Sequence, residues 1–82
     1  MVQINLAIAV SYAKSPESAL QQLSVVAQDK RILSYQPYHA ALGDLLARTG
    51  KIGQARQSLM RAAEMSENQA ERRFLVDKAA RL

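Results

Sequence analysis

The chain repeats one apolar pattern at an interval of 36 residues, and this repeat limits the folds that are open to it. Shifting the sequence by that interval places Leu6 on Leu42 and, four residues later, Val10 on Leu46. Further along, the same shift aligns Ala19 with Ala55, Leu23 with Leu59, and Val26 with Ala62. Repeats of about 20 to 50 residues are typical of stacked supersecondary units. The sequence therefore predicts two similar units that pack on each other.

The spacing inside each unit is helical. Apolar residues recur at steps of three and four, and hydrophobic residues make up 49% of the chain while aromatic residues make up only 5%. This alanine- and leucine-rich mixture favours closely packed helices over strands. The pattern predicts helices over residues 2–13, 16–28, 37–49, 52–65 and 69–82.

Local signals set the expected helix ends. Ser15 is a good N-cap residue and Pro16 suits a first helical position, so a helix is expected to begin there. Pro37 cannot stand inside a helix, which predicts a second start at that residue. Gly50 can adopt the left-handed conformation that ends a helix, so the helix from Pro37 is expected to stop at Thr49.

Two further segments carry weaker signals. Ile32 and Leu33 follow a polar connection and are expected to form one extra turn. Asn68 with Glu71 three residues later resembles a capping box, which predicts the start of the last helix. The stripe expected to bury that helix consists of Phe74, Leu75, Ala79 and Leu82.

Small residues occupy the positions where helices of one unit are expected to cross. Ala7 and Gly43 stand in the first helix of each unit, and Ala19 and Ala55 stand in the second. Small side chains let two helix backbones approach closely, while Leu59 and Ala62 are expected to fill the adjacent space. Gly53, in the first turn of its helix, costs up to about 1 kcal/mol relative to alanine.

These patterns predict an all-α fold of antiparallel helical hairpins, in a right-handed tetratricopeptide-like stack of about five helices. A chain of 82 residues is enough for one domain. The expected parts of that domain are hairpin 1 over about 2–28, hairpin 2 over about 37–66, and a closing helix over about 69–82. A generic helical bundle is the alternative fold.

The second unit resembles the tetratricopeptide repeat family. That family has Leu-Gly in the first helix of its repeat and small, large and small residues in the second. Leu42 and Gly43 match the first helix. The second helix is matched by Ala55, Leu59 and Ala62. The sequence departs from the family pattern at His39, which stands at the usual tryptophan position, and at Leu46, which stands at the usual tyrosine position.

A narrower resemblance rests on three strings. They read INLAIAV at residues 4–10, YHAA at 38–41 continuing to DLLARTG at 44–50, and NQAERRFL at 68–75. Together they are similar to the C-terminal tetratricopeptide-like extension of bacterial sigma-factor-like proteins, related to the extracytoplasmic function group of RNA polymerase sigma factors. The resemblance implies a regulatory domain without the polymerase- and promoter-binding parts. Its expected partner is a sigma-factor domain, RNA polymerase or a regulator.

The same resemblance places a candidate partner-binding groove on the first helix of each hairpin. Ile8 and Tyr12 of the first unit are expected to face Asp44 and Arg48 of the second. The groove positions that the family pattern adds are Ile4, Ser11, Ala40 and Ala47. The alternative for Asp44 and Arg48 is an ordinary intrahelical ion pair between residues four apart.

The residues that most often carry chemistry are scarce. The chain has no cysteine and a single histidine, His39, so neither a thiolate metal site nor a set of imidazole ligands is available. The glycines fall at helix positions rather than in a phosphate-binding loop. We therefore expect no cofactor, no metal and no catalytic site, and the chain is not expected to be an enzyme.

Charge leaves two alternatives open. Eleven Lys and Arg against seven Asp and Glu give a net charge of +4, and most of the basic residues lie in the second half of the chain. This half could contact nucleic acid, although acidic residues at helical spacing favour a mixed-charge surface. A short stack exposes apolar ends, so a homodimer is expected as an alternative to a monomer.

The compartment is expected to be the cytoplasm. The lack of cysteine gives no indication of an oxidising environment. The apolar run from Val2 to Val10 is interrupted by Gln3 and Asn5, and it is too short to span a bilayer. We therefore expect neither a signal peptide nor a membrane anchor, and no membrane partner.

Overall fold

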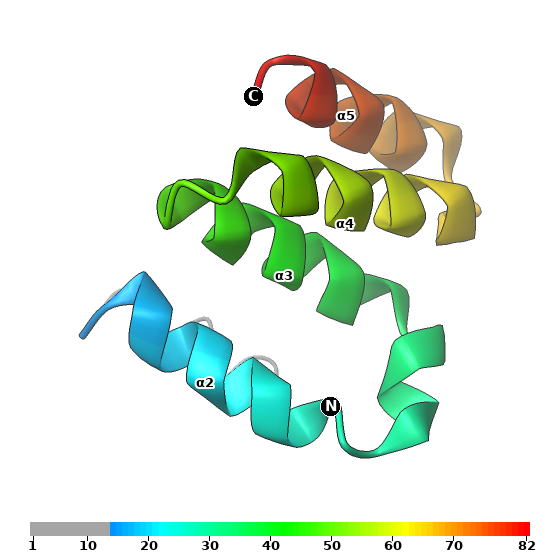
Figure 1. Cartoon of the computed structure of the whole chain (residues 1–82). Helices are drawn as coiled ribbons and strands as arrows, with labels where there is room; N and C mark the ends of the chain where they lie inside the picture. Colours follow the sequence, from blue (N-terminus) through cyan, green and yellow to red (C-terminus); the bar gives the residue numbers. More distant parts are fainter. Residues whose placement is uncertain (1–13) are drawn as a thin grey trace.

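The computed structural model describes residues 14–82, and this part of the chain is all-helical, as predicted (Figure 1). Its elements are α2 (Pro16–Val26), a short 3-10 helix η1 (Lys30–Ser34), α3 (Gln36–Arg48), α4 (Ile52–Met65) and α5 (Gln69–Ala80). The prediction of about five helices is corrected to four α-helices within residues 14–82. The helix predicted over residues 2–13, with Ala7 on it, lies outside the described residues.

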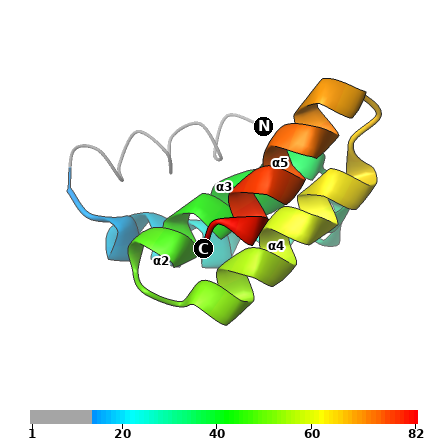
Figure 2. The same ribbon diagram turned by 90° about the horizontal axis from the view of Figure 1, so that it is seen from above.

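The helices pack in the order in which they occur along the chain. α2 contacts α3, α3 contacts α4, and α4 contacts α5 (Figure 1). The view from above shows α5 running alongside α4 (Figure 2). Each helix therefore has its main contacts with its sequence neighbours, and α3 lies between α2 and α4.

Both predicted N-caps are present. The side chain of Ser15 accepts a hydrogen bond of 3.2 Å from the backbone N–H of Ser18, with Pro16 as the first residue of α2. Asn68 accepts a hydrogen bond of 3.1 Å from the N–H of Glu71 at the start of α5. Each cap satisfies one of the backbone donors that a helix leaves unpaired in its first turn.

The ends of α3 differ from prediction by one residue. The helix begins at Gln36 rather than Pro37, because proline fits the second helical position as well as the first when its missing N–H is not required. It ends at Arg48, with Thr49 as the C-cap, and Gly50 follows with φ of 83°. Gly50 therefore has the left-handed backbone that the sequence predicts.

The predicted extra turn is η1, and side chains hold it at both ends. Asp29 caps it by accepting from the N–H of Arg31 at 3.1 Å, and the Arg31 guanidinium pairs with the same carboxylate at 2.7 Å. These hydrogen bonds from Arg31 lower the pKa of Asp29. At the other end, Nε2 of His39 donates to the carbonyl of Leu33 at 2.9 Å, and the ring lies edge-on to Tyr38. His39 thus fixes the corner between η1 and α3.

The buried residues form two clusters. The first contains Ala19, Leu23, Ile32, Tyr38, Ala41 and Leu45, from α2, η1 and α3. The second contains Leu59, Ala62, Ala63, Leu75 and Ala79, from α4 and α5. Ala40 on α3 packs against the second cluster, so α3 contacts both. The residues that the 36-residue repeat aligns, Ala19 with Ala55 and Leu23 with Leu59, are all fully buried.

Helices α3 and α4 approach each other closely at Gly43. A Cβ atom on Gly43 would lie 2.7 Å from Cγ of Leu59 and 3.2 Å from the carbonyl oxygen of Ala55. These distances leave no room for a side chain at Gly43, because real Cβ contacts are rarely this short. The Leu-Gly pair of the repeat pattern therefore stands where the two helices cross.

One part of the predicted buried stripe on α5 is wrong. Leu75 and Ala79 are buried and Leu82 is partly buried, but Phe74 is 63% exposed. Phe74 is one position before Leu75, which turns it about 100° around the helix and away from α4. Its ring therefore belongs to the surface of the molecule.

Candidate interaction surface

Asp44 links two helices that are not neighbours in the chain. Its carboxylate accepts a hydrogen bond of 2.9 Å from Nζ of Lys78 on α5, and it pairs with Arg48 on its own helix at 3.1 Å. The side chains of Asp44 and Lys78 are about one third exposed. The predicted pair of Asp44 and Arg48 is therefore present, and the contact with Lys78 adds a connection from α3 to α5.

An aromatic ring lies on the other side of Lys78. Its Nζ is 6.0 Å from the centroid of the Phe74 ring, at the outer limit of a cation–π contact. Phe74 and Lys78 are four residues apart, and Glu71 precedes Phe74 by three, so the three side chains share one side of α5. That side of α5 faces Asp44.

A shallow hollow of about 340 Å³ lies between these helices. It is lined by Gln36, Pro37, Ala40, Ala41, Asp44, Leu45 and Glu71. We define the α3/α5 face as this hollow together with Phe74 and Lys78. Gln36 also donates to the carbonyl of Ala62 at 3.4 Å, which ties the wall of the hollow to the end of α4.

The α3/α5 face contains part of the predicted groove. Asp44 lines the hollow, and so does Ala40, but Arg48 lies beside it as the ion-pair partner of Asp44. Ile8 and Tyr12, and with them Ile4 and Ser11, lie outside the described residues. Sequence reasoning missed Glu71, Phe74 and Lys78. Their spacing of three and four was a usable signal, because it marks a second stripe on α5 beside the buried one.

The α3/α5 face combines polar and small apolar side chains. Its polar side chains are one amide, two carboxylates and one amine, set around small apolar residues. Within residues 14–82 no cluster of three or more His, Asp or Glu residues could hold a metal ion. His39 is engaged with the carbonyl of Leu33 and lies at the η1–α3 corner.

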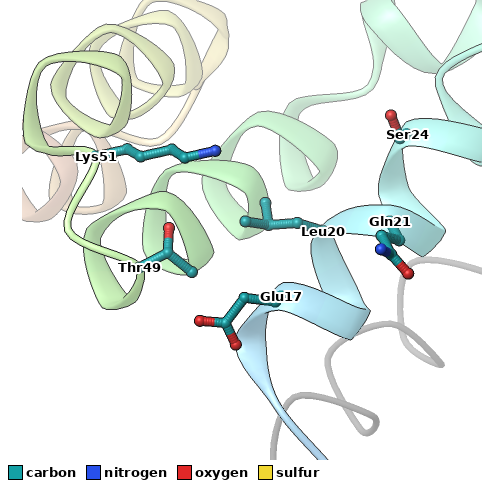
Figure 3. A pocket seen from close by; sticks show the side chains of 6 residues that line it. All are labelled: Glu17, Leu20, Gln21, Ser24, Thr49 and Lys51. Atoms are coloured by element: carbon teal, nitrogen blue, oxygen red, sulfur yellow. The ribbon is translucent and has the colours of Figure 1, made fainter.

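A second hollow, of about 430 Å³, lies between α2 and the turn from α3 to α4. Figure 3 shows Leu20 pointing from α2 toward this turn, with Glu17 and Lys51 on opposite sides of the hollow. Thr49 also lines this hollow, and its hydroxyl donates a hydrogen bond of 3.0 Å to the carbonyl of Leu46. No ion pair joins its lining residues within residues 14–82, whereas Asp44 and Lys78 connect two helices at the first hollow, so this hollow is the weaker candidate.

Most basic side chains of the second half are engaged by other parts of the chain. Arg56 donates to the carbonyls of Ala79 and Leu82, at 3.3 and 3.2 Å, and Arg72 donates to the carbonyl of Ser66 at 2.8 Å. Other basic side chains of this half form ion pairs, which join Arg48 and Lys78 to Asp44, Arg61 to Glu64, and Arg81 to Asp77. These partners leave few basic groups free for phosphates. The helices of residues 14–82 also lack the length and apolar character needed to cross a membrane.

Comparison with known proteins adds one relative. No protein-family model matches the chain, and no solved structure matches it. An uncharacterized protein of Rhizobium meliloti (strain 1021) is 32% identical over 75 residues, and the match covers 92% of this chain. The chain spans 17% of the length of that protein. This chain is thus similar to one small part of a much longer bacterial protein.

Proposed function

We propose that the chain is a non-catalytic protein-interaction module with tetratricopeptide-like stacking, and that its α3/α5 face receives a segment of a partner protein. The observation that carries this proposal is the exposed ring of Phe74 beside Lys78, whose amine pairs with Asp44 on the wall of an open hollow. An exposed aromatic ring next to a polar cluster is typical of interaction surfaces. The close α3–α4 contact at Gly43 supports the tetratricopeptide-like stacking.

We further propose that this module is the regulatory C-terminal domain of a bacterial sigma-factor-like protein that acts in transcription initiation in the cytoplasm. Support comes from the sequence strings of the repeat units and from the similarity to one part of a longer bacterial protein. Its partner is a sigma-factor domain, RNA polymerase or a regulator.

The number of basic residues in the second half makes nucleic-acid binding the alternative function. The net charge of +4 favours it, because unpaired basic groups bind phosphates. The observed partners of Arg48, Arg56, Arg61, Arg72, Lys78 and Arg81 oppose it. A homodimer is a further alternative, supported by the exposed apolar side chains.

The test is affinity capture from a bacterial lysate with three baits, washed at low and then at high salt. The baits are the unchanged chain, Phe74→Ser, and Val25→Ser as a control. Val25 is 65% exposed and Phe74 is 63% exposed, so both changes remove an equally exposed apolar side chain. We expect RNA polymerase subunits or a sigma-like polypeptide on the unchanged chain and on Val25→Ser, and a marked loss on Phe74→Ser.

Two results contradict the proposal in different ways. Equal capture by Phe74→Ser and the unchanged chain would show that the α3/α5 face is not the binding surface. Capture of nucleic acid alone, removed by high salt, would show that the basic residues carry the function instead.

A further inference from the structure

A second surface lies on the opposite side of α5. Two adjoining hollows, of about 330 and 340 Å³, share Arg72 and Val76 as lining residues. We define the outer face as the surface that lines both. It consists of Met60, Ala63 and Glu64 from α4 and Gln69, Arg72, Arg73 and Val76 from α5.

The floor of the outer face is apolar. Met60 is 38% exposed and Val76 is 41% exposed, and buried Ala63 lies with them in one hollow. Two helices that lie side by side form a shallow groove along their line of contact, and a third helix fits such a groove. Gln69 and Val76 mark about two turns of α5, or roughly 10 Å at about 1.5 Å per residue. A short helix is long enough to cover it.

The rim of the outer face is basic. Glu64 is already paired with Arg61 at 3.5 Å. The guanidinium of Arg72 donates to the uncharged carbonyl of Ser66, and no ion pair joins it to a carboxylate within residues 14–82. Arg73 is exposed on the same rim, and no ion pair joins it to another residue within 14–82. Two positive charges therefore flank the apolar floor.

These charges select the occupant. A second copy of the outer face would bring two more basic side chains and no unpaired carboxylate to offset them, because its Glu64 is already paired with Arg61. A nucleic acid would leave Met60 and Val76 without an apolar partner. We infer that the outer face binds an amphipathic helix of a partner protein, with apolar residues along one side and acidic residues beside them.

This surface is separate from the α3/α5 face. Phe74 and Glu71 lie on one side of the buried residue Leu75, and Arg72 and Val76 lie on the other. The two binding surfaces can therefore be tested independently, and failure of one does not imply failure of the other.

The test uses a designed peptide of about four helical turns, with leucines at i, i+3, i+4 and i+7 and glutamates at most other positions. A second peptide carries lysines in place of the glutamates. Binding to the full chain is measured by fluorescence anisotropy. We expect the acidic peptide to bind at least about tenfold more tightly than the basic one.

Substitutions then locate the site. Arg73→Glu and Val76→Ser are each expected to weaken acidic-peptide binding by about tenfold, because one reverses a rim charge and the other removes part of the floor. Lys51→Glu is the matched control, since it makes the same change of charge at an exposed residue at the start of α4, away from the outer face. Lys51→Glu and Phe74→Ser are expected to leave binding within about twofold.

Three results would overturn the inference. Equal loss of binding in Arg73→Glu and Lys51→Glu would mean that net charge alone attracts the peptide. Tighter binding of a mixed-sequence single-stranded oligonucleotide than of the acidic peptide would assign the basic rim to nucleic acid. A dimer in sedimentation that Val76→Ser dissociates would assign the outer face to a second copy.

Discussion

At the crossing of α3 and α4, the side chain of Leu59 fills the space that a side chain on Gly43 would need. A Cβ atom on Gly43 would lie 2.7 Å from Cγ and 2.8 Å from Cδ2 of Leu59, which is fully buried. Leu59 cannot move away easily, because a side chain with no exposed surface has neighbours on every side.

Gly43→Ala is therefore expected to destabilise the domain. Overpacking lowers the free energy of unfolding by about 1–3 kcal/mol, and the better helix propensity of alanine offsets about 0.5–1 kcal/mol of this loss. We expect a net loss of roughly 1–2 kcal/mol in the free energy of unfolding, and several kcal/mol for Gly43→Leu, measured by urea denaturation.

Gly53→Ala is the matched control for that change, and its sign is expected to be opposite. Gly53 lies in the first turn of α4, and no atom lies within 4 Å of a Cβ placed there. The substitution should raise the free energy of unfolding by about 0.5–1 kcal/mol through helix propensity alone. If both alanine variants change stability in the same direction, the close crossing at Gly43 is not the cause.

The Asp44–Lys78 contact is expected to make a small, salt-sensitive contribution to stability. Because both side chains are about one third exposed, solvent screens the pair, and a double-mutant cycle with Asp44→Asn and Lys78→Met should give at most about 1 kcal/mol. The coupling should shrink in high salt. The more exposed pair of Asp77 and Arg81 on α5 serves as the reference, with an expected few tenths of a kcal/mol. A coupling that high salt leaves unchanged would contradict an ion pair.

Tyr38 is expected to make the domain less stable in alkali. Burial raises the pKa of its hydroxyl above the ordinary value of 10.0. The unfolded chain therefore loses this proton at lower pH than the folded chain does. The stabilisation from the neutral hydroxyl is complete below about pH 10 and is lost as the pH rises through the pKa of the folded state.

The measurement is the urea midpoint of the unchanged chain and of Tyr38→Phe as the pH is raised from about 8 to about 11. This range begins below the ordinary tyrosine pKa and ends above it. The midpoint of the unchanged chain should fall more steeply above pH 10, because only that chain has a buried hydroxyl at this position. Identical slopes would contradict the role of Tyr38.

Asn68→Ala is expected to cost about 1 kcal/mol of stability. The substitution removes the hydrogen bond from the N–H of Glu71 to the Asn68 side chain at the start of α5. Asn68→Ser should retain most of the stability, since serine can accept the same bond. Equal unfolding midpoints for the two variants would show that the cap contributes nothing measurable.

The sequence predicts the helices of residues 14–82 well because their signals are local. Ser15, Pro16, Gly50 and Asn68 act on the backbone within one turn of where they stand. The small errors in helix ends arise where a local signal is compatible with more than one position. Pro37 permits either of two helical positions, and only the neighbouring structure decides that α3 begins at Gln36.

The surface was harder to predict because its residues meet across the fold. Lys78 contacts Asp44 across 34 residues, and Arg56 reaches the carbonyls of Ala79 and Leu82 from an adjacent helix. Helical periodicity indicates which side of a helix a residue occupies, but not which helix lies opposite. Phe74 shows the limit, since a residue next to a buried stripe can turn outward.

The two buried clusters have a consequence for how the domain opens. The first cluster joins α2 and η1 to one side of α3, while the second joins α4 and α5, and Ala40 and Gly43 of α3 pack against it. Separating α2 and η1 from α3 breaks the first cluster and leaves the second intact. The domain can therefore lose its structure in two steps, with α2 and η1 as a unit of local unfolding and the packed helices α3, α4 and α5 persisting after it.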